Sequence, residues 1–408
     1  MISYPEALEK IKQQVLPLES ERVEVNQALG RVNVHAIESP LNLPSFRNSA
    51  MDGYAIRSKD LQHANAIQPV RLKLLAKTYA GHKNPSIPNP VNTAVKVMTG
   101  AIVNDCYDAV VPIENILSSD AAFVSFHQPI KVGTNIREVG ADFIKDQVIV
   151  NPDVTVTAEY IMALASINLK KITVYRNPKF SIISTGKELI KSKQKILNSV
   201  GIFDSNGPYI QSFLQQKGYP KINKITYITD SPKTFANHLA KLNVASQKTD
   251  VIISTGAVSA GEIDFIPAIL RDMGALIVFH KVAIRPGKPI LFAVLKNGSY
   301  YFGLPGNPMS AAIGMQFFVY PLLNWLKNQV HKQPMMVRLA HGIQLSIALC
   351  FFLKAKININ SQGEPSAEIL AGQESFKILP LLQANAFIML SDGTRMYQKG
   401  EWVPAYFL

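Results

Sequence analysis

Hydrophobic residues near the start of the chain follow one face of a helix. Ala7, Leu8, Ile11 and Val15 recur near helical spacing, and Pro5 stands where the first turn of a helix tolerates proline. The pattern predicts a short amphipathic helix over residues 4–15.

From about residue 69 to 150 the pattern changes to short apolar runs that Gly, Pro and Asn interrupt. Five of these runs are typical of strands: VRLKLLAKTYAG, NTAVKVMTGAIV, DAVVPIENI, AAFVSFHQPI and DQVIVNPDV. Apolar residues in short runs between turn-forming residues favour a β-rich domain. We place it at residues 44–140.

The stretch SPLNLPSFRNSAMDGYAI, residues 39–56, crowds prolines, polar residues and a glycine into 18 positions. Proline fixes φ and removes a backbone donor, so we expect neither a regular helix nor a central strand here. The stretch is therefore predicted to be a shaped loop. On spacing alone it is either a turn between two domains or a loop that serves a site.

Strands and helices alternate from residue 180 to 326. A helix TAEYIMALASIN with Thr157 as its cap and a strand KKITVYR come before this region. Within it, the strands FSIIST, KINKITYITD and DVIIST alternate with the helices YIQSFLQQKG, SPKTFANHLAKLN and DFIPAILRDMG. The alternation predicts a doubly wound α/β sheet whose ligands bind at the carboxyl ends of its strands. The polar linker LKNQVHKQPMM follows, and residues 337–408 return to short strand-like runs that predict a small terminal β-domain.

Composition supports a globular chain of several domains. It has 408 residues, 47% hydrophobic and 17% charged, with no apolar run long enough to span a membrane. The N-terminus has early charges and no apolar signal core, so we expect a cytoplasmic protein. Cys106 and Cys350 lie far apart, which argues against a disulfide framework or a zinc site.

The net charge of +13 could serve to bind nucleic acid, to bind an anionic small molecule, or only to keep the protein soluble. The densest cluster, KELIKSKQK at 187–195, holds four lysines, and the other cations are scattered without interleaved aromatic residues. Proteins that bind single strands combine cations with stacking aromatic side chains. We therefore expect no nucleic-acid partner.

Four polar or glycine-rich loops leave the predicted strands of the α/β region. They are STGKEL at 184–189, STGAVSAGEIDF at 254–265, AIRPGKPI at 283–290 and GLPGNPMS at 303–310. Small residues after a strand let backbone N–H groups approach an anion, so phosphate binding is predicted, although glycine also serves ordinary tight turns.

Charged residues accompany these loops. Glu188, Asp230 and Asp264 each follow a predicted strand and could provide the carboxylates that Mg²⁺ takes beside a phosphate. They could equally be helix N-caps, Asp264 in particular. Lys281, Arg285 and Lys288 flank a Pro-Gly turn and could hold a multiply charged oxyanion, or could simply be solvated.

Seven segments in order, SAMDGYA, MTGAIV, NIREVGAD, STGKEL, STGAVSAGEIDF, RPGKPILF and GLPGNPMS, closely resemble the molybdopterin molybdenumtransferases. These are the bacterial molybdenum insertases, related to the E domain of gephyrin. The resemblance covers residues 5–326, and it implies that adenylylated molybdopterin and molybdate react to give molybdenum cofactor and AMP, with Mg²⁺ required. It also implies that the SAMDGYA loop serves the site of a neighbouring subunit.

Carried over residue by residue, the resemblance implies catalytic roles for Glu188, Asp264 and Asp52, and metal binding by Asp230 and Asp264. It implies substrate binding by Thr99, Arg137, Asp142, Ser254, Gly256, Ser259, Lys281, Arg285, Lys288, Pro305, Asn307 and Ser310. Chemically, Mg²⁺ and cations stabilise charge that develops on phosphoryl oxygens, and no nucleophilic side chain is needed.

The resemblance further implies a homodimer of four-domain chains, with the molybdopterin adenylyltransferase as a partner. The expected division is a linker and dimerisation region at 1–43 and 141–177, the β-rich domain at 44–140, a molybdopterin-binding α/β domain at 178–328 and a β-domain at 335–408.

The chain departs from the family pattern in several places. Arg285 stands where the family usually has lysine, and Ala257 replaces a glycine, which matters only if that residue needs a positive φ. The terminal domain lacks the family's strand arginine, so molybdate would depend on Arg285, Lys288 and Ser310, with Ser375 or Lys354 assisting. This divergence leaves a second hypothesis open, a molybdopterin-binding or scaffold protein with weakened insertion.

Overall fold

The computed structural model describes the chain except for residues 84, 88, 191–200, 221, 223, 229–230, 243–248, 259–264, 331–332 and 392. The chain forms two compact units. One combines Met1–Glu21 with Val174–Leu408, and the other is Arg22–Thr173. A pair of strands, β1 (Ser20–Glu24) and β12 (Lys171–Tyr175), lies where the chain passes from one unit to the other.

The predicted N-terminal helix is confirmed as α1 (Tyr4–Gln14). Ser3 caps it reciprocally with Glu6, because the Ser3 hydroxyl accepts from the Glu6 N–H while the Glu6 carboxylate accepts from the Ser3 N–H. Its buried residues Tyr4, Ala7 and Ile11 belong to the core of the α/β domain. The helix therefore packs with the α/β unit, whereas the predicted division places it with residues 22–43.

A six-stranded sheet forms the centre of the α/β domain. Its order is β16 (Thr226–Ile228), β13 (Phe180–Thr185), β17 (Val251–Thr255), β21 (Tyr300–Leu304), β20 (Leu291–Val294) and β18 (Leu276–His280). The first four strands are parallel, and β20 runs antiparallel to both of its neighbours. The doubly wound sheet is thus confirmed, with one reversed strand that the alternation did not predict.

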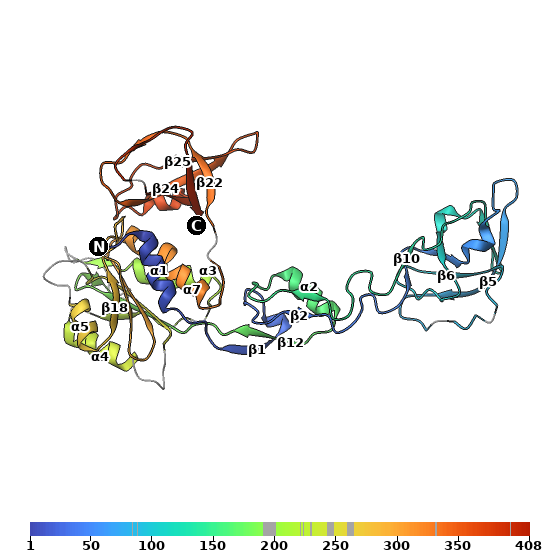
Figure 1. Ribbon diagram of the computed structural model, residues 1–408, viewed down its shortest axis with the longest axis horizontal. Coiled ribbons are helices and arrows are strands. Elements are labelled where there is room, and N and C mark those ends of the chain that lie inside the picture. The colour runs from blue at the N-terminus through green and yellow to red at the C-terminus, as the bar shows by residue number, and fades with distance from the viewer. Residues whose placement is uncertain are drawn as a thin grey trace. The chain divides into compact units, whose positions relative to one another are not determined.

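Helices cover both faces of this sheet (Figure 1). One face packs against α1, α3 (Asn206–Gln216), α6 (Pro308–Gly314) and α7 (Tyr320–Trp325), and the other against α4 (Pro232–Leu242) and α5 (Ile266–Asp272). A π-helical turn, Met315–Val319, joins α6 to α7. Because Pro321 has no N–H, the Phe317 carbonyl lacks its usual helical donor, and it accepts instead from the Tyr4 hydroxyl at 3.4 Å.

The C-terminal residues form a closed barrel, which confirms the predicted small β-domain. Its strands pair in the circular order β24 (Cys350–Ile359), β25 (Pro365–Ile369), β22 (Met335–Leu339), β28 (Trp402–Phe407) and β26 (Ala386–Leu390), and β26 returns to β24. A short helix, α8 (Leu379–Gln383), precedes β26, and β23 (Ile343–Gln344) pairs with β27 (Met396–Tyr397). The barrel is tied to the α/β domain by β19 (Ile284–Arg285), which pairs with β24.

The second unit is built on another six-stranded sheet. Its order is β7 (Ala109–Pro112), β4 (Gly53–Ile56), β6 (Thr93–Val97), β5 (Val70–Thr78), β9 (Phe123–Phe126) and β8 (Ser118–Ser119). Two small pairs accompany it, β2 (Ile37–Glu38) with β11 (Val148–Val150) and β3 (Asn48–Ser49) with β10 (Ile136–Arg137). The predicted helix after Thr157 is α2 (Ala158–Ser166), although the Thr157 side chain makes no capping bond to its backbone.

The stretch at residues 39–56 differs in part from its prediction. Pro40 and Pro44 precede a loop, but Gly53–Ile56 forms strand β4 between β7 and β6, so the expectation of no central strand was wrong for these four residues. A Cβ atom on Gly53 would lie 2.2 Å from the Val111 carbonyl oxygen. The glycine is therefore what lets β4 approach β7 this closely.

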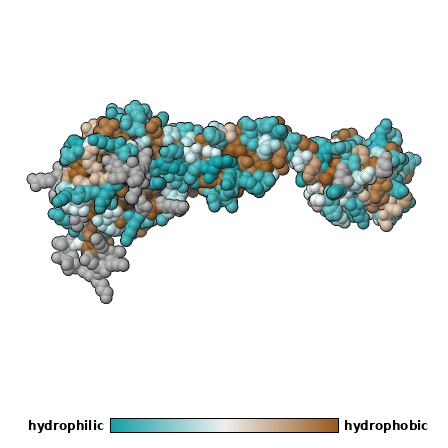
Figure 2. Space-filling view, turned by 90° about the horizontal axis from the view of Figure 1, so that it is seen from below, coloured by the Kyte–Doolittle hydropathy of each residue, from teal (hydrophilic) through white to brown (hydrophobic). Residues whose placement is uncertain are grey.

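Among the described residues, no helix is long and apolar enough to cross a membrane. Hydrophilic residues cover most of the visible surface, and apolar residues interrupt it in separate patches (Figure 2). The predicted four-domain boundaries stay a prediction.

Candidate functional site

The described parts of the four polar loops lie at one edge of the α/β sheet. They follow β13, β17, β18 and β21, whose carboxyl ends point the same way. The Thr185 hydroxyl donates to the Thr255 carbonyl at 2.9 Å, and the Gly256 N–H donates to the Leu304 carbonyl at 3.0 Å. Gly256 has a φ of +87°, and a Cβ there would lie 2.6 Å from the Thr185 carbonyl oxygen. This position therefore needs glycine.

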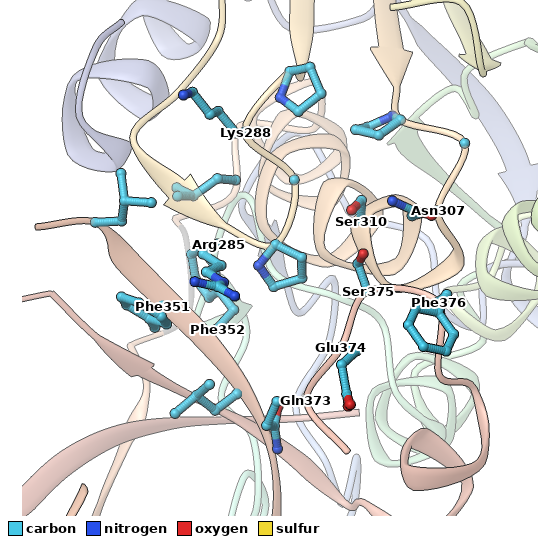
Figure 3. Close-up of a pocket in the computed structure, with 18 of the residues that line it drawn as sticks. Arg285, Lys288, Asn307, Ser310, Phe351, Phe352, Gln373, Glu374, Ser375 and Phe376 are labelled. Atoms are coloured by element: carbon cyan, nitrogen blue, oxygen red, sulfur yellow. The ribbon is translucent and has the colours of Figure 1, made fainter. Parts of the chain in front are cut away.

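A cleft of about 1020 Å³ opens between these loops and the barrel. Residues 284–289, 305–307 and 310 line one side of it, and residues 343–346, 349, 351–353 and 373–376 of the barrel line the other (Figure 3). We call these sides the α/β wall and the barrel wall.

The α/β wall carries the cleft's cations. Arg285 and Lys288 are exposed to the cleft, and no other Lys or Arg of the described residues lines it. The Arg285 guanidinium lies 5.9 Å from the centroid of the Phe351 ring on the barrel wall, and the backbones of these two residues are register partners. Arg285 is thus held beside an aromatic face while its charge stays available to an anion.

A second cleft of about 490 Å³ adjoins the first. It lies at the carboxyl ends of β13 and β17 and includes Thr185, Gly256 and the start of α3. Five residues line both clefts: Glu188, Ile202, Gly306, Asn307 and Phe376. None of the described residues forms a hydrogen bond or an ion pair with the Glu188 carboxylate, which lies at the junction of the two clefts.

The beginning of α3 contributes polar residues that were not among the predicted site residues. Asp204 accepts from the N–H groups of Asn206 and Gly207 at 3.0 and 3.1 Å and from the Ser184 hydroxyl at 2.7 Å. The Asn206 side chain donates to the Gly306 carbonyl at 2.7 Å. The helix was expected to begin at Tyr209, but the run Asp-Ser-Asn just before it is typical of a helix start and could have revealed these residues.

A loop of the barrel, residues 372–377, is held by a buried lysine. Lys354 is 1% exposed, and its ammonium donates to the carbonyls of Gly372 at 2.7 Å and of Glu374 and Lys377 at 3.4 Å. Burial lowers the pKa of this lysine below its ordinary value. The expectation that Lys354 assists with molybdate is therefore wrong in this structure, because its donors are committed to backbone carbonyls.

The same loop also contacts the α/β domain. The Met309 N–H of α6 donates to the Ser375 carbonyl at 3.0 Å, which brings Ser375 next to Ser310 (Figure 3). Both serines line the large cleft. One hydroxyl from each wall is thus available there.

The structure gathers many of the predicted site residues. Those that line one or both clefts are Glu188, Gly256, Arg285, Lys288, Pro305, Asn307 and Ser310. Ser254 and Lys281 line neither cleft: Ser254 is buried and shares a hydrogen bond with the Tyr301 hydroxyl at 2.5 Å. Asp230, Ser259 and Asp264 lie outside the described residues.

Four predicted site residues, Asp52, Thr99, Arg137 and Asp142, belong to the second unit, and all four are exposed. One Asp52 carboxylate oxygen accepts from the Thr99 N–H at 2.7 Å and from its hydroxyl at 2.8 Å. These two bonds hold the pKa of Asp52 below its ordinary value, so its carboxylate stays ionised. Arg137 lies on β10 and Asp142 on the loop that follows it.

Three family models match the chain. They are the MoeA N-terminal region (domain I and II) at residues 2–168, a "Probable molybdopterin binding domain" at 181–325 and the MoeA C-terminal region (domain IV) at 338–408. A molybdopterin molybdenumtransferase of Synechococcus elongatus is 33% identical over 360 residues, covering 88% of each chain. The chain belongs to the molybdopterin molybdenumtransferase family. These proteins are enzymes of molybdenum cofactor biosynthesis.

Further family members agree in sequence and in structure. A molybdopterin molybdenumtransferase of Haemophilus influenzae is 32% identical and covers 99% of this chain and 98% of its own. A MoeA protein of Pyrococcus horikoshii is similar in fold, with a TM-score of 0.83 at 23% identity over the whole of both chains. The model of the C-terminal region extends the family assignment to the barrel, where the sequence resemblance is weak.

Metal ligands are sparse among the residues that the structure describes. They include no group of three or more His, Cys, Asp or Glu side chains placed to hold a metal ion. Glu188 is a single carboxylate at the junction of the clefts, and two further predicted ligands, Asp230 and Asp264, lie outside the described residues.

Proposed function

We propose that this family member inserts molybdenum from molybdate into adenylylated molybdopterin, which gives molybdenum cofactor and AMP. The observation that carries the proposal is the pair of adjoining clefts with Glu188 at their junction. One cleft carries two cations, and the other lies at the carboxyl edge of the sheet, where doubly wound folds bind their ligands. A substrate with a ring system, phosphates and a metal-binding end suits two linked clefts.

Molybdate is assigned to the large cleft. It is a doubly charged tetrahedral oxyanion, and charge-assisted hydrogen bonds hold such an ion best. Arg285 and Lys288 provide the charge, and Ser310 and Ser375 provide hydroxyl donors from opposite walls. The forked guanidinium of Arg285 can donate two hydrogen bonds to one oxyanion, which a lysine cannot do.

Mg²⁺ is proposed as the cofactor, and the Glu188 carboxylate is a ligand of the kind that it binds. Mg²⁺ takes oxygen ligands from one or two carboxylates together with substrate phosphate oxygens. Glu188 lies at the junction without a partner among the described residues, whereas Asp204 already accepts three hydrogen bonds. Glu188, with Asp230 and Asp264 as predicted ligands, would hold the ion. When bound, it would neutralise charge that develops on the phosphoryl oxygens of the bond being cleaved.

A homodimer with a shared site is part of the proposal. Asp52 is ionised and is held by two hydrogen bonds from Thr99. The contacts described within its own unit assign its charge no further role. Helix α2 also offers an apolar surface to a second copy of the chain. Its sequence is AEYIMALAS, yet only Leu164 of the helix is buried, and Met162 is 71% exposed. We propose that the Asp52 loop of one subunit completes the site of the other. The proposed source of the substrate is a molybdopterin adenylyltransferase in the cytoplasm.

A second candidate function is binding of molybdopterin without efficient insertion. One observation favours it. Lys354 is committed to backbone carbonyls, and Lys377 of the same loop forms an ion pair with Glu374, so the described barrel wall contributes no cation to an anion.

Reconstitution decides between the two. Purified protein receives adenylylated molybdopterin, Mg²⁺ and molybdate, and AMP release and active cofactor are measured together. Both products are expected in the wild type, and both should fall strongly in Glu188→Gln. Binding of molybdopterin without AMP release would support the second function, and the matched control is Glu364→Gln, an exposed carboxylate of the barrel outside both clefts.

Hybrid dimers test the shared site. Asp52→Asn and Glu188→Gln should each be inactive alone, but mixed dimers contain one site in which both carboxylates are intact. Some AMP release should therefore return on mixing. If mixed dimers form and remain inactive, the site is not shared in this way.

A further inference from the structure

Phe376 is a large aromatic residue left 65% exposed at the junction of the two clefts. It comes from the barrel, and it lines both clefts together with Asn307 of the α/β domain (Figure 3). Exposing an aromatic ring to water forgoes the stabilisation that its burial would give. A ligand that covered the ring would recover it.

The backbone on both sides of Phe376 is fixed. The Ser375 carbonyl accepts from the Met309 N–H at 3.0 Å, and the Lys377 carbonyl accepts from the Lys354 ammonium at 3.4 Å. Gln373 adds a double link to strand β24, because its side chain accepts from the Lys354 N–H and donates to the Lys354 carbonyl. The exposed ring therefore stands on a pre-organised loop, and a ligand would pay little to order it.

The surroundings of the ring indicate what it would bind. The junction residues beside it are neutral or apolar except for Glu188, and the cations Arg285 and Lys288 lie farther along the same cleft. Such an arrangement suits a ligand that joins a planar ring to an anionic group. We infer that Phe376 is a specificity-determining residue that stacks on the planar nitrogen heterocycle of the substrate. This inference rests on the proposed function, and two rings of that substrate, pterin and adenine, share the chemistry.

Phe376 has exposed apolar neighbours that could instead mark a protein contact. Leu379 and Leu382 of α8 are 68% and 76% exposed. They line neither cleft, however, whereas Phe376 lines both. This difference favours a small planar ligand over a protein partner.

Two probes in the full-length protein test the inference. Neopterin monophosphate carries the pterin ring and AMP carries adenine, and each is titrated by calorimetry into wild type, Phe376→Leu and Phe376→Trp. Leucine keeps an apolar side chain but removes the π face, so one probe should bind about 5- to 100-fold more weakly, while tryptophan should preserve its binding. The probe that weakens identifies the ring. Molybdate, which has no ring, should bind all three proteins equally.

Two matched variants complete the design. Phe407→Leu changes another half-exposed phenylalanine of the barrel, and Leu382→Ala changes the exposed face of α8, and both should bind the probes as wild type does. Equal binding of both probes to wild type and Phe376→Leu would overturn the inference. An equal loss in Leu382→Ala would also overturn it, in favour of a wider surface. Absent AMP release by wild type in reconstitution would overturn the proposed function separately, because the probe titrations do not depend on turnover.

Discussion

The two walls of the large cleft use their charged residues in opposite ways. On the α/β wall, Arg285 and Lys288 lie at the surface of a tight turn and face the cleft. On the barrel side, Lys354 is buried, and it holds a loop that presents Ser375 and Phe376. A lysine near a site therefore does not by itself indicate anion binding, since burial and existing partners decide what its charge does. The described cations of the cleft therefore come from the α/β wall, and the barrel wall contributes a hydroxyl and an aromatic ring.

The largest effect should come from the α/β wall. Arg285→Met is expected to weaken molybdate binding about 10- to 100-fold, because a charge-assisted hydrogen bond is lost. Isothermal titration of molybdate measures it. The control Lys356→Met removes an exposed cation of the barrel outside both clefts and should leave the affinity unchanged. Equal losses in both variants would mean that only net charge matters.

The next effect belongs to the barrel wall and concerns stability. Lys354→Met should lower the free energy of unfolding by about 1–3 kcal/mol, because three backbone carbonyls lose their charged donor. Urea denaturation measures it, and molybdate affinity should fall less than in Arg285→Met. Lys356→Met, two residues along the same strand, again serves as the control. Unchanged stability with a large loss of molybdate affinity would show that Lys354 contacts the anion.

Local patterns accounted for most of the fold. The strands and helices of the α/β domain follow from hydrophobic periodicity and capping residues, and the meeting of the four loops follows from the alternation of strands with helices. Features that depend on distant partners were not accessible. The docking of α1 depends on residues about 300 positions later, and the strand Gly53–Ile56 depends on its two neighbours.

The site shows the same division. Arg285, Lys288 and Asn307 lie in recognisable turns, and the structure places all three on the large cleft. The role of Lys354 could not be predicted, because it depends on a loop 18 to 23 residues away that folds back over its strand. Phe376 was missed because an isolated phenylalanine in a sequence is usually a core residue.

A matched pair of serines sharpens the comparison of the walls. Ser310→Ala and Ser375→Ala each remove one cleft hydroxyl, one from each wall. Each hydroxyl is a neutral donor that a water molecule can replace at the anion, so each variant should lose less affinity than Arg285→Met, about 2- to 10-fold. Equilibrium titration at fixed ionic strength compares them. An effect confined to Ser310 would assign all anion contacts to the α/β wall.

The smallest effect concerns backbone strain on the α/β side. Ala257 adopts a φ of +51°, a positive value that favours glycine. The alanine at this position, where the family has glycine, is therefore strained. Ala257→Gly should raise the free energy of unfolding by up to about 1 kcal/mol, which differential scanning calorimetry would detect as a higher melting temperature. Ala283→Gly, at a residue without positive φ, should lower it. A lower melting temperature in Ala257→Gly would contradict the prediction.

The N-terminal helix α1 has a consequence for synthesis on the ribosome. The Tyr4 hydroxyl bonds to Phe317, 313 residues later, and translation at about 5–20 residues per second separates the two by roughly 15 to 60 s. During that time residues 22–173 can complete their own core. Ala7 and Ile11 stay exposed until the residues of the α/β domain that bury them have been synthesised. A nascent chain halted before residue 317 would therefore carry an undocked amphipathic helix, which is the kind of segment that chaperones bind.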